Sequence, residues 1–536
     1  MPDFAFAASL ADLPDGSMRQ VDVGGTAVLL SRVDGEVYAT TAFCTHYGAP
    51  LAGGVLRGST VVCPWHHAAF DVCSGALCEP PALDALRTFP VELRSDEVWV
   101  AAPTDADAHG KGVAYRESDG TTPDMADAAA DDRLALILGA GAAGQAAAEA
   151  LREDGFAGRI ALVTPEARAP YDRTKLSKAY LAGDAPGEAL PLRDRTFFER
   201  HGIELWTGRE VVALDAEART AKLSDGESVR YDACLVATGG TPRRLPVDGA
   251  DLGGVHVLRS WEDAQAVVAA AEGAARAVVV GGSFIGMETA SSLTGRGVEV
   301  TVVDRAEVPL AAALGDALGR MLQDAAEAKG VRFALGAELD RIERDGDGLA
   351  VHLAGGEPLR ADLVVLGVGV TPATGFLDGA PFRRDDGGLD ADAALQLAPA
   401  LFAAGDVAAY PEARLGERVR IEHWRLAQQH GRHAARNLFA DEPAPFTGVP
   451  FFWTGQFGVN VRYVGHAEGW DEVVVDGSLA DRDAAVYYLA GGRAVAGAFV
   501  GRDPAAASFE LLLAERGLPT ADAVREGFDP AAALAG

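Results

Sequence analysis

The chain has 536 residues, of which 49% are hydrophobic and 23% are charged, and this ordinary globular composition excludes general disorder. Its 47 basic and 78 acidic residues leave a net charge of −31, which argues against nucleic acid and against anionic membranes as partners. A chain of this length is expected to hold several domains.

The N-terminal end predicts no targeting segment. It has no basic stretch before an apolar run, and no part of the chain is apolar for long enough to suit a membrane span. Of the five cysteines, two are assigned below to a metal site, and an odd number left over is typical of a reducing compartment. We therefore expect a cytoplasmic protein.

Two short loops near the start each combine one cysteine with one histidine. They read Cys44-Thr45-His46 and Cys63-Pro64-Trp65-His66, with sixteen residues between them. In a [2Fe-2S] centre, two thiolates can hold one iron and two neutral imidazoles the other. The predicted metal ligands are therefore Cys44, His46, Cys63 and His66, and the predicted chemistry is transfer of single electrons.

Two alternatives remain open at this site. A tetrahedral zinc ion takes the same ligand types, although zinc fingers usually pair cysteine with cysteine and histidine with histidine. The fourth ligand also has a neighbouring competitor, His67. The Cys-x-x-His spacing favours His66, which leaves His67 as an expected rim residue.

Residues 1–102 resemble a Rieske-type ferredoxin of the aromatic-dioxygenase kind, and the match continues through Phe70-Asp71-Val72-Cys73-Ser74-Gly75. The resemblance implies an all-β domain. Respiratory Rieske proteins carry an extra cysteine in each ligand loop, at positions that read here as Ala49 and Trp65. The absence of these two cysteines implies a reduction potential toward the low end of the Rieske range, roughly −150 mV. After this domain, residues 103–132 are rich in Asp, Ala, Gly and Thr and predict a flexible linker.

Two strand-turn-helix units with glycine-rich turns follow the linker. An apolar strand at 134–138 precedes the first turn, and a second strand at 277–280 precedes the other. Such turns let a pyrophosphate approach the backbone and rest on a helix N-terminus, so two dinucleotides are predicted. In the second turn, Ser283 replaces the middle glycine and is expected to narrow the approach slightly. The predicted nucleotide-binding glycines are Gly139, Gly141, Gly144, Gly281, Gly282 and Gly286.

An acidic residue follows the next strand of each unit. Asp304 ends the strand at 298–303, where a carboxylate hydrogen-bonds the ribose and repels a 2′-phosphate. This favours NADH over NADPH, although the adjacent Arg305 weakens the preference. In the first unit Glu166 is the nearest acid and the predicted ribose ligand.

Three later segments complete the pattern: 235–239, with Thr238 and Gly239; 367–377, with Gly369; and 401–406, with Asp406. With them the chain resembles the pyridine nucleotide-disulfide oxidoreductase superfamily. It is most similar to the ferredoxin reductases of oxygenase systems and to the Rieske-containing apoptosis-inducing-factor-like proteins. The resemblance implies FAD and NADH as cofactors, places Asp406 at the ribityl chain of FAD, and makes Thr238, Gly239 and Gly369 cofactor-binding residues.

The segment at 170–178 lies where disulfide reductases keep a cysteine pair, and it contains no cysteine. By resemblance, Arg173 contacts the FAD phosphates, and Lys178 pairs with Glu288 beside the flavin as the catalytic residues. A buried cation there would stabilise the reduced, anionic ring. His423 and Trp424, at the start of an expected helix, would border the flavin.

The predicted fold class is multidomain. An all-β Rieske domain (1–102) and the linker (103–132) precede two α/β Rossmann-like, three-layer ββα nucleotide-binding domains and a small α+β domain. The FAD domain is discontinuous, at 133–255 and 378–447, because the NAD domain at 256–377 is inserted into it. Residues 448–536 form the C-terminal α+β domain.

The predicted function is transfer of electrons from NADH through FAD to the fused [2Fe-2S] cluster and on to an external acceptor. An oxygenase, a cytochrome or a ferredoxin would suit this role, and a homodimer is a further expected assembly. The alternative is a redox sensor of the apoptosis-inducing-factor kind, whose output is dimerisation or partner binding.

Overall fold

The computed structural model describes residues 3–101 and 131–535. The segment expected to be a linker therefore lies, apart from its last two residues, outside the described part of the chain. Among the described residues, no helix is both long and apolar enough to cross a membrane.

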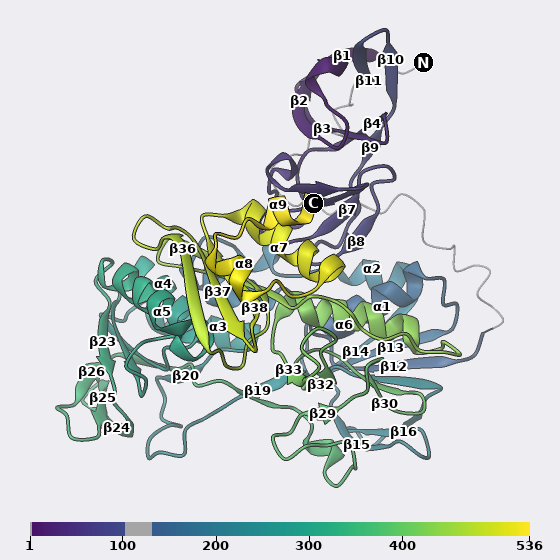
Figure 1. Cartoon of the computed structure of the whole chain (residues 1–536). Coiled ribbons are helices and arrows are strands. Elements are labelled where there is room, and N and C mark those ends of the chain that lie inside the picture. The colour runs from purple at the N-terminus through teal and green to yellow at the C-terminus, as the bar shows by residue number, and fades with distance from the viewer. Residues whose placement is uncertain (1–2, 102–130, 536) are drawn as a thin grey trace.

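The N-terminal part consists of three small antiparallel sheets, ordered β1-β11-β10, β2-β3-β4-β9 and β5-β6-β7-β8. The purple ribbon in Figure 1 projects from the remainder, with β7 and β8 at the end nearest the C-terminal helices. Both cysteine-histidine loops belong to this near end, because one precedes β5 and the other joins β6 to β7. The strands are β1 (Phe4–Ser9), β2 (Met18–Val23), β3 (Thr26–Val33), β4 (Glu36–Thr41), β5 (Val55–Arg57), β6 (Thr60–Val62), β7 (Ala69–Asp71), β8 (Leu77–Glu79), β9 (Thr88–Phe89), β10 (Val91–Arg94) and β11 (Glu97–Ala101).

A six-stranded sheet, ordered β14-β13-β12-β18-β31-β30, is parallel except at the β30–β31 edge. All five residues of β12 are buried, as expected for a strand covered on both faces. Helix α1 follows β12 and lies directly against α6, so that a methyl group on Gly431 would come 2.0 Å from the Ala143 carbonyl oxygen. The elements are β12 (Leu134–Leu138), α1 (Ala142–Glu153), β13 (Arg159–Thr164), α2 (Arg195–Arg200), β14 (Ile203–Thr207), β18 (Ala233–Val236), β30 (Gln396–Ala398), β31 (Leu401–Ala403) and α6 (Trp424–Asn437).

A second parallel sheet has the order β20-β27-β21-β22-β23. The chain enters this unit through β19 and leaves it through β28, and these two strands pair with each other. In Figure 1 the two parallel sheets lie side by side, teal for the second and blue for most of the first. The elements are β19 (Gly240–Pro242), β20 (Val255–Val257), α3 (Trp261–Ala271), β21 (Arg276–Val280), α4 (Phe284–Gly295), β22 (Glu299–Asp304), α5 (Ala311–Glu327), β23 (Arg332–Leu335), β27 (Leu363–Leu366) and β28 (Val370–Pro372).

The C-terminal end forms an antiparallel sheet, ordered β34-β35-β38-β37-β36, and three helices that reach the N-terminal part. Its elements are β34 (Phe451–Gln456), β35 (Val459–Gly465), β36 (Glu472–Ser478), β37 (Asp483–Ala490), β38 (Arg493–Val500), α7 (Asp503–Arg516), α8 (Ala521–Arg525) and α9 (Pro530–Ala535). Three smaller sheets complete the described fold: β15 (Val211–Asp215), β16 (Thr220–Leu223) and β17 (Ser228–Arg230); β24 (Leu339–Asp345), β25 (Gly348–Leu353) and β26 (Leu359–Ala361); and β29 (Leu389–Asp390), β32 (Ala408–Pro411) and β33 (Arg418–Arg420).

Candidate functional site

The two cysteine-histidine loops have the same backbone construction. Each cysteine N–H donates to the carbonyl of an alanine five residues later, and each cysteine carbonyl accepts from the residue before that alanine. That donor is Gly48 in the first loop and His67 in the second, and both have positive φ angles, of 75° and 58°. The repeated turn brings the side chains of the two loops to a common point.

The structure places the predicted ligands in two pairs. The Nδ1 atoms of His46 and His66 lie 3.1 Å apart, and the thiols of Cys44 and Cys63 are both buried. The interaction between the two thiols raises the pKa of Cys44 and lowers the pKa of Cys63. Burial lowers the pKa of His46 to about 4 and that of His66 well below its ordinary value. Neutral imidazoles and a thiolate are the forms that bind metal.

The pairing fits a dinuclear cluster better than a single ion. Within the described residues, no three His, Cys, Asp or Glu side chains converge as a zinc ion would require. Two thiols on one side and two imidazoles on the other match a cluster whose two irons have unlike ligands.

His67 is not a rim residue, and that expectation is wrong. The side chain is fully buried, its ring stacks on Phe451 with centroids 4.0 Å apart, and its Nδ1 lies 2.5 Å from Glu510 Oε2. Its positive φ turns the side chain away from His46 and toward α7. The geometry thus brings His66, and not His67, beside the other imidazole.

Both glycine-rich turns have the geometry that a bound pyrophosphate requires. Gly139 and Gly281 have φ angles of 109° and 107°, and a Cβ on Gly144 or Gly286 would meet the carbonyl oxygen of that glycine at 1.8 or 1.9 Å. Gly141 is the N-cap residue of α1, and a side chain built on it would meet nothing within 4 Å. The backbone at the N-terminus of α1 is therefore open to a phosphate.

Ser283 does more than narrow the second turn. Its hydroxyl accepts from the Gly286 N–H at 3.2 Å, which caps α4, and donates to the Gly367 carbonyl at 2.7 Å. The side chain thus holds the turn to the end of the neighbouring strand β27. Gly369, two residues further, has a φ of 90° and open space where a Cβ would stand.

Asp304 stands at the end of β22 beside the second turn. Its carboxylate accepts from the backbone N–H groups of Gly282 and Ala306. This is the position from which a carboxylate reaches a nucleotide ribose. The Arg305 side chain is 81% exposed and lies 4.0 Å from Glu338, so it points to solvent.

Three of the side chains predicted to hold FAD, Glu166, Arg173 and Asp406, belong to one connected network. The Arg173 guanidinium pairs with Glu166 and donates to the Tyr171 hydroxyl at 2.9 Å. It also donates to the Arg259 carbonyl, and the Arg259 side chain in turn pairs with Asp406 at 2.8 Å. These contacts bring together residues from four separate segments of the sequence.

Glu166 therefore binds a cation of the chain, which sequence reasoning did not expect. Thr238 has a buried hydroxyl without a hydrogen-bond partner in the described part of the structure, and the adjacent Gly239 has a φ of 65°. Buried polar groups without a hydrogen-bond partner are rare in proteins. A buried hydroxyl that lacks a partner beside a glycine turn fits a site for a polar cofactor.

Lys178 and Glu288 meet as expected. Lys178 Nζ lies 2.7 Å from Glu288 Oε2, which also accepts from the Ser177 hydroxyl at 2.5 Å. The other carboxylate oxygen accepts from Thr454 at 2.7 Å, and Glu288 is only 3% exposed. Lys178 has a non-helical backbone, with φ −113° and ψ −110°, at a kink in the short helix Leu176–Tyr180.

His423 and Trp424 mark the start of α6, where His423 is the N-cap residue. Burial lowers the pKa of His423 to about 4, so the ring is neutral, and it lies 4.3 Å from the ring of Phe452. Trp424 is half-buried and packs against the core of the first parallel sheet.

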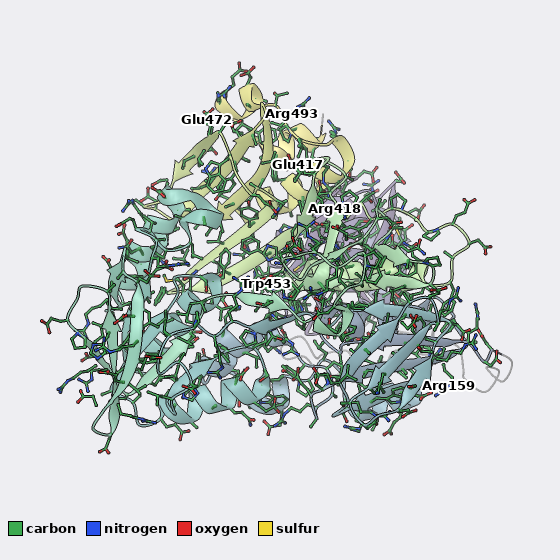
Figure 2. The ribbon with its side chains drawn as sticks, turned by 90° about the horizontal axis from the view of Figure 1, so that it is seen from below. Arg159, Glu417, Arg418, Trp453, Glu472 and Arg493 are labelled. Carbon is green, nitrogen blue, oxygen red and sulfur yellow. The ribbon has the colours of Figure 1, made fainter. Side chains whose placement is uncertain are left out.

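The N-terminal loops and the reductase segments touch directly, through contacts that the sequence did not predict. The Trp453 ring lies 4.3 Å from the His66 ring and 6.1 Å from that of His46. Figure 2 labels Trp453 near the centre of the molecule. The Tyr47 hydroxyl donates to Asp172, which is next to Arg173. From the sequence, the aromatic residues Phe451, Phe452, Trp453 and Phe457 are expected to face the core, the flavin or a dimer partner, and contact with the cysteine-histidine loops is not among these expectations.

Three family models match the chain. The Rieske [2Fe-2S] domain matches residues 4–90, the pyridine nucleotide-disulphide oxidoreductase family matches 135–431, and the reductase C-terminal domain matches 451–535. Apoptosis-inducing factor 3 of Mus musculus is 38% identical over 517 residues, which cover 95% of this chain and 84% of that protein.

Oxygenase reductases are also similar. The biphenyl dioxygenase system ferredoxin–NAD(+) reductase component of Paraburkholderia xenovorans (strain LB400) is 36% identical over 64% of this chain and 83% of its own length. The reductase in the covalent putidaredoxin reductase–putidaredoxin complex is 32% identical, with a TM-score of 0.69 over 72% of this chain and 94% of that one.

These matches and the paired side chains establish the cofactors. The chain is an FAD-dependent NAD(P)H oxidoreductase, it carries a [2Fe-2S] cluster of the Rieske type, and the zinc alternative is set aside. The protein belongs to the pyridine nucleotide-disulphide oxidoreductase family, with a Rieske domain fused at its N-terminal side and a reductase C-terminal domain following.

Proposed function

We propose that the protein takes electrons from NADH through FAD to its own Rieske cluster and passes them to an external acceptor. The observation that carries this proposal is the position of Trp453. Its ring lies 4.3 Å from His66, and its neighbour Thr454 hydrogen-bonds Glu288, the partner of Lys178. A single strand, β34, thus contacts both the cluster loop and the predicted flavin pair.

The residues divide into three groups by their proposed role. Cys44, Cys63, His46 and His66 would hold the cluster, and the two Rossmann-like units would hold FAD and NADH. The FAD unit would comprise 133–255 with 378–447, the NAD unit 256–377, the Rieske domain 1–102 and the C-terminal domain 448–536. The proposed nucleotide contacts are Gly139, Gly141, Gly144, Glu166, Arg173, Thr238, Gly239, Asp406, His423 and Trp424 for FAD, and Gly281, Gly282, Gly286, Asp304 and Gly369 for NADH.

When bound, FAD accepts a hydride and releases single electrons. The protein positions the cofactors and supplies compensating charge. Lys178, with Glu288 as its carboxylate partner, would supply a fixed positive charge beside the ring. The carboxylate is shielded from water, since Glu288 is 3% exposed, whereas the Lys178 side chain is 25% exposed.

NADH is the proposed donor because Asp304 ends β22 beside the second glycine turn, where a ribose ligand is expected, and Arg305 is turned to solvent. The similar reductases named above work, by their names, with a biphenyl dioxygenase system and with putidaredoxin. The acceptor proposed for this chain is therefore an oxygenase, a cytochrome or a ferredoxin. None of the five cysteines, all within the described residues, forms a disulfide, which supports the cytoplasm as the proposed location.

Stopped-flow mixing of the oxidised holoprotein with NADH under anaerobic conditions tests the proposal. We expect flavin bleaching followed by cluster reduction within the same molecules, at a rate independent of protein concentration, with the paramagnetic signal of the reduced cluster in frozen samples. Glu288→Gln should slow reduction of the flavin by NADH roughly a hundredfold, because the change removes the carboxylate that pairs with the Lys178 ammonium. A cluster that stays oxidised while NADH changes the association state would favour the sensor function instead.

A further inference from the structure

A hollow of about 510 Å³ opens beside the proposed cluster ligand His66. Its N-terminal wall contains Tyr47, Trp65 and His66, and its C-terminal wall contains Arg462, Arg482 and Asp503. Trp65 is 36% exposed, which is unusual for so large an apolar side chain. The volume falls within the range of small-molecule sites.

The hollow gives access to the cluster edge without separating the domains. On its other side, His66 is covered by Trp453. Buried ion pairs hold the two parts together: Arg425, 2% exposed, bonds Glu510 at 2.7 Å and the Pro80 carbonyl at 2.8 Å. Arg193 likewise joins Asp84 of the N-terminal part to Glu149 of α1. A large protein cannot enter a hollow of this size, whereas a small molecule can.

The charges in the hollow favour an anion. Arg462 is paired with Asp503 at 3.1 Å and donates to the Trp65 carbonyl. Arg482 is exposed, its Nη1 donates to the Gly458 carbonyl at 3.3 Å, and it has no carboxylate partner in the part of the chain that the structure describes. The wall therefore carries one more cation than anions, in a protein whose net charge is −31.

We propose that this hollow is a second exit from the cluster, at which a small anionic one-electron oxidant binds next to His66 and Arg482. The inference rests on the proposed function, since the cluster must first be reduced. Each oxidant molecule takes one electron and no proton. Oxidation of one NADH to NAD⁺ and one proton thus reduces two oxidant molecules.

Ferricyanide is the probe, because it is small, strongly anionic and takes one electron. The full-length holoprotein is reduced anaerobically, freed of excess reductant and mixed with ferricyanide, while the cluster absorbance is followed. Because the cluster absorbance is followed, oxidation of the cluster at this site is distinguished from direct oxidation of the flavin. Binding is measured independently by calorimetry on the oxidised protein with hexacyanocobaltate, which has the same shape and charge and is not reduced.

The test variant is Arg482→Glu, and the matched control is Arg19→Glu. Both arginines are exposed and the two changes alter the net charge equally, but Arg19 lies on β2, at the end far from the C-terminal helices in Figure 1. Arg482 has a φ of 57°, which glutamate adopts with the same strain as arginine. Neither residue touches the predicted cofactor ligands.

At low ionic strength we expect Arg482→Glu to slow cluster reoxidation by ferricyanide roughly tenfold and to weaken hexacyanocobaltate binding. The effect should shrink in ~1 M salt. Arg19→Glu should change the rate less than about twofold. Equal rates in all three proteins, or no hexacyanocobaltate binding to the parent, would overturn the exit site. A parent cluster that NADH does not reduce, but that dithionite does, would instead overturn the proposed function.

Discussion

At the scale of single residues, the second ligand loop illustrates how backbone geometry selects between adjacent side chains. His66 and His67 have the same chemistry, but the turn that begins at Cys63 requires a positive φ at the position of His67, where the first loop has Gly48. That φ directs the His67 ring to Glu510 and leaves His66 beside His46. A one-residue difference in position therefore separates a metal ligand from an interface residue.

Replacing His66 by cysteine should keep a cluster and lower its reduction potential. Thiolate donates more charge to iron than imidazole does, so the potential should move from roughly −150 mV toward the roughly −400 mV of all-cysteine plant-type centres. A redox titration followed by paramagnetic resonance measures the shift. An unchanged potential and spectrum would remove His66 from the ligand set.

Asp304→Asn should reduce the preference for NADH over NADPH roughly tenfold. The amide keeps an acceptor oxygen for the Gly282 N–H but loses the charge that strengthens the ribose hydrogen bond and repels a 2′-phosphate. The ratio of the two kcat/KM values is the readout. Asparagine is preferable to alanine because the turn at Gly282 also depends on this side chain. An unaltered ratio would contradict the assignment of Asp304.

At the scale of elements, the close approach of α1 and α6 positions the proposed FAD site. The two helices pack where small residues let their backbones approach each other. Gly144 lets α1 begin directly over the carbonyl oxygen of Gly139, and Gly431 lets α6 lie against Ala143. The N-terminus of α1 lies close to the glycine turn as a result, and it favours negative charge.

Gly431→Ala should destabilise the protein by ~1–3 kcal/mol and weaken FAD retention, because the new methyl group would meet the Ala143 carbonyl at 2.0 Å. The matched control is Gly295→Ala at the end of α4, where a Cβ meets nothing within 4 Å. Alanine there should be neutral or stabilise by up to ~1 kcal/mol. Thermal unfolding and flavin content measure both variants, and equal melting temperatures would contradict the packing argument.

At the scale of the whole molecule, the Rieske domain is docked against two different partners. Arg193 and Asp172 contact it from the first parallel-sheet unit, and Glu510 contacts it from α7 of the C-terminal domain. The docked arrangement places the cluster loops against Trp453. Domain docking of this kind would make the proposed electron transfer intramolecular.

Glu510→Gln should loosen the docked domain. Arg425 is 2% exposed, so loss of its carboxylate partner leaves a buried charge unpaired, at roughly 3–5 kcal/mol. We expect cluster reduction by NADH to slow at least about tenfold while flavin reduction stays unchanged, and small-angle scattering to show a more extended particle. Arg57→Gln is the control, since its pair with Glu515 on the same helix is more than a third exposed and contributes less than about 1 kcal/mol. Equal effects of both variants would contradict the role of the Arg425–Glu510 pair in docking the domain.

Much of the redox site was predictable because its signals are local. The cysteine-histidine spacing, the two glycine turns and the acid at Asp304 each lie within a few residues of the element that creates them. The pairing of Lys178 with Glu288, 110 positions apart, was available only through resemblance. The role of Glu166 as a ribose ligand stays a prediction, and its ion pair with Arg173 was not foreseen.

The amino-acid sequence by itself determined the ligand chemistry, the number of nucleotide units and the order of the predicted domains, because short-range motifs and hydrophobic periodicity encode these properties locally. Only the tertiary structure decided how the cysteine-histidine loops lie against the reductase domains. The contacts of Tyr47 with Asp172 and of Arg425 with Pro80 join residues 125 and 345 positions apart. Such contacts depend on how separately folded domains pack against each other. The local sequence around a residue has no periodic pattern that identifies a contact made only when domains dock.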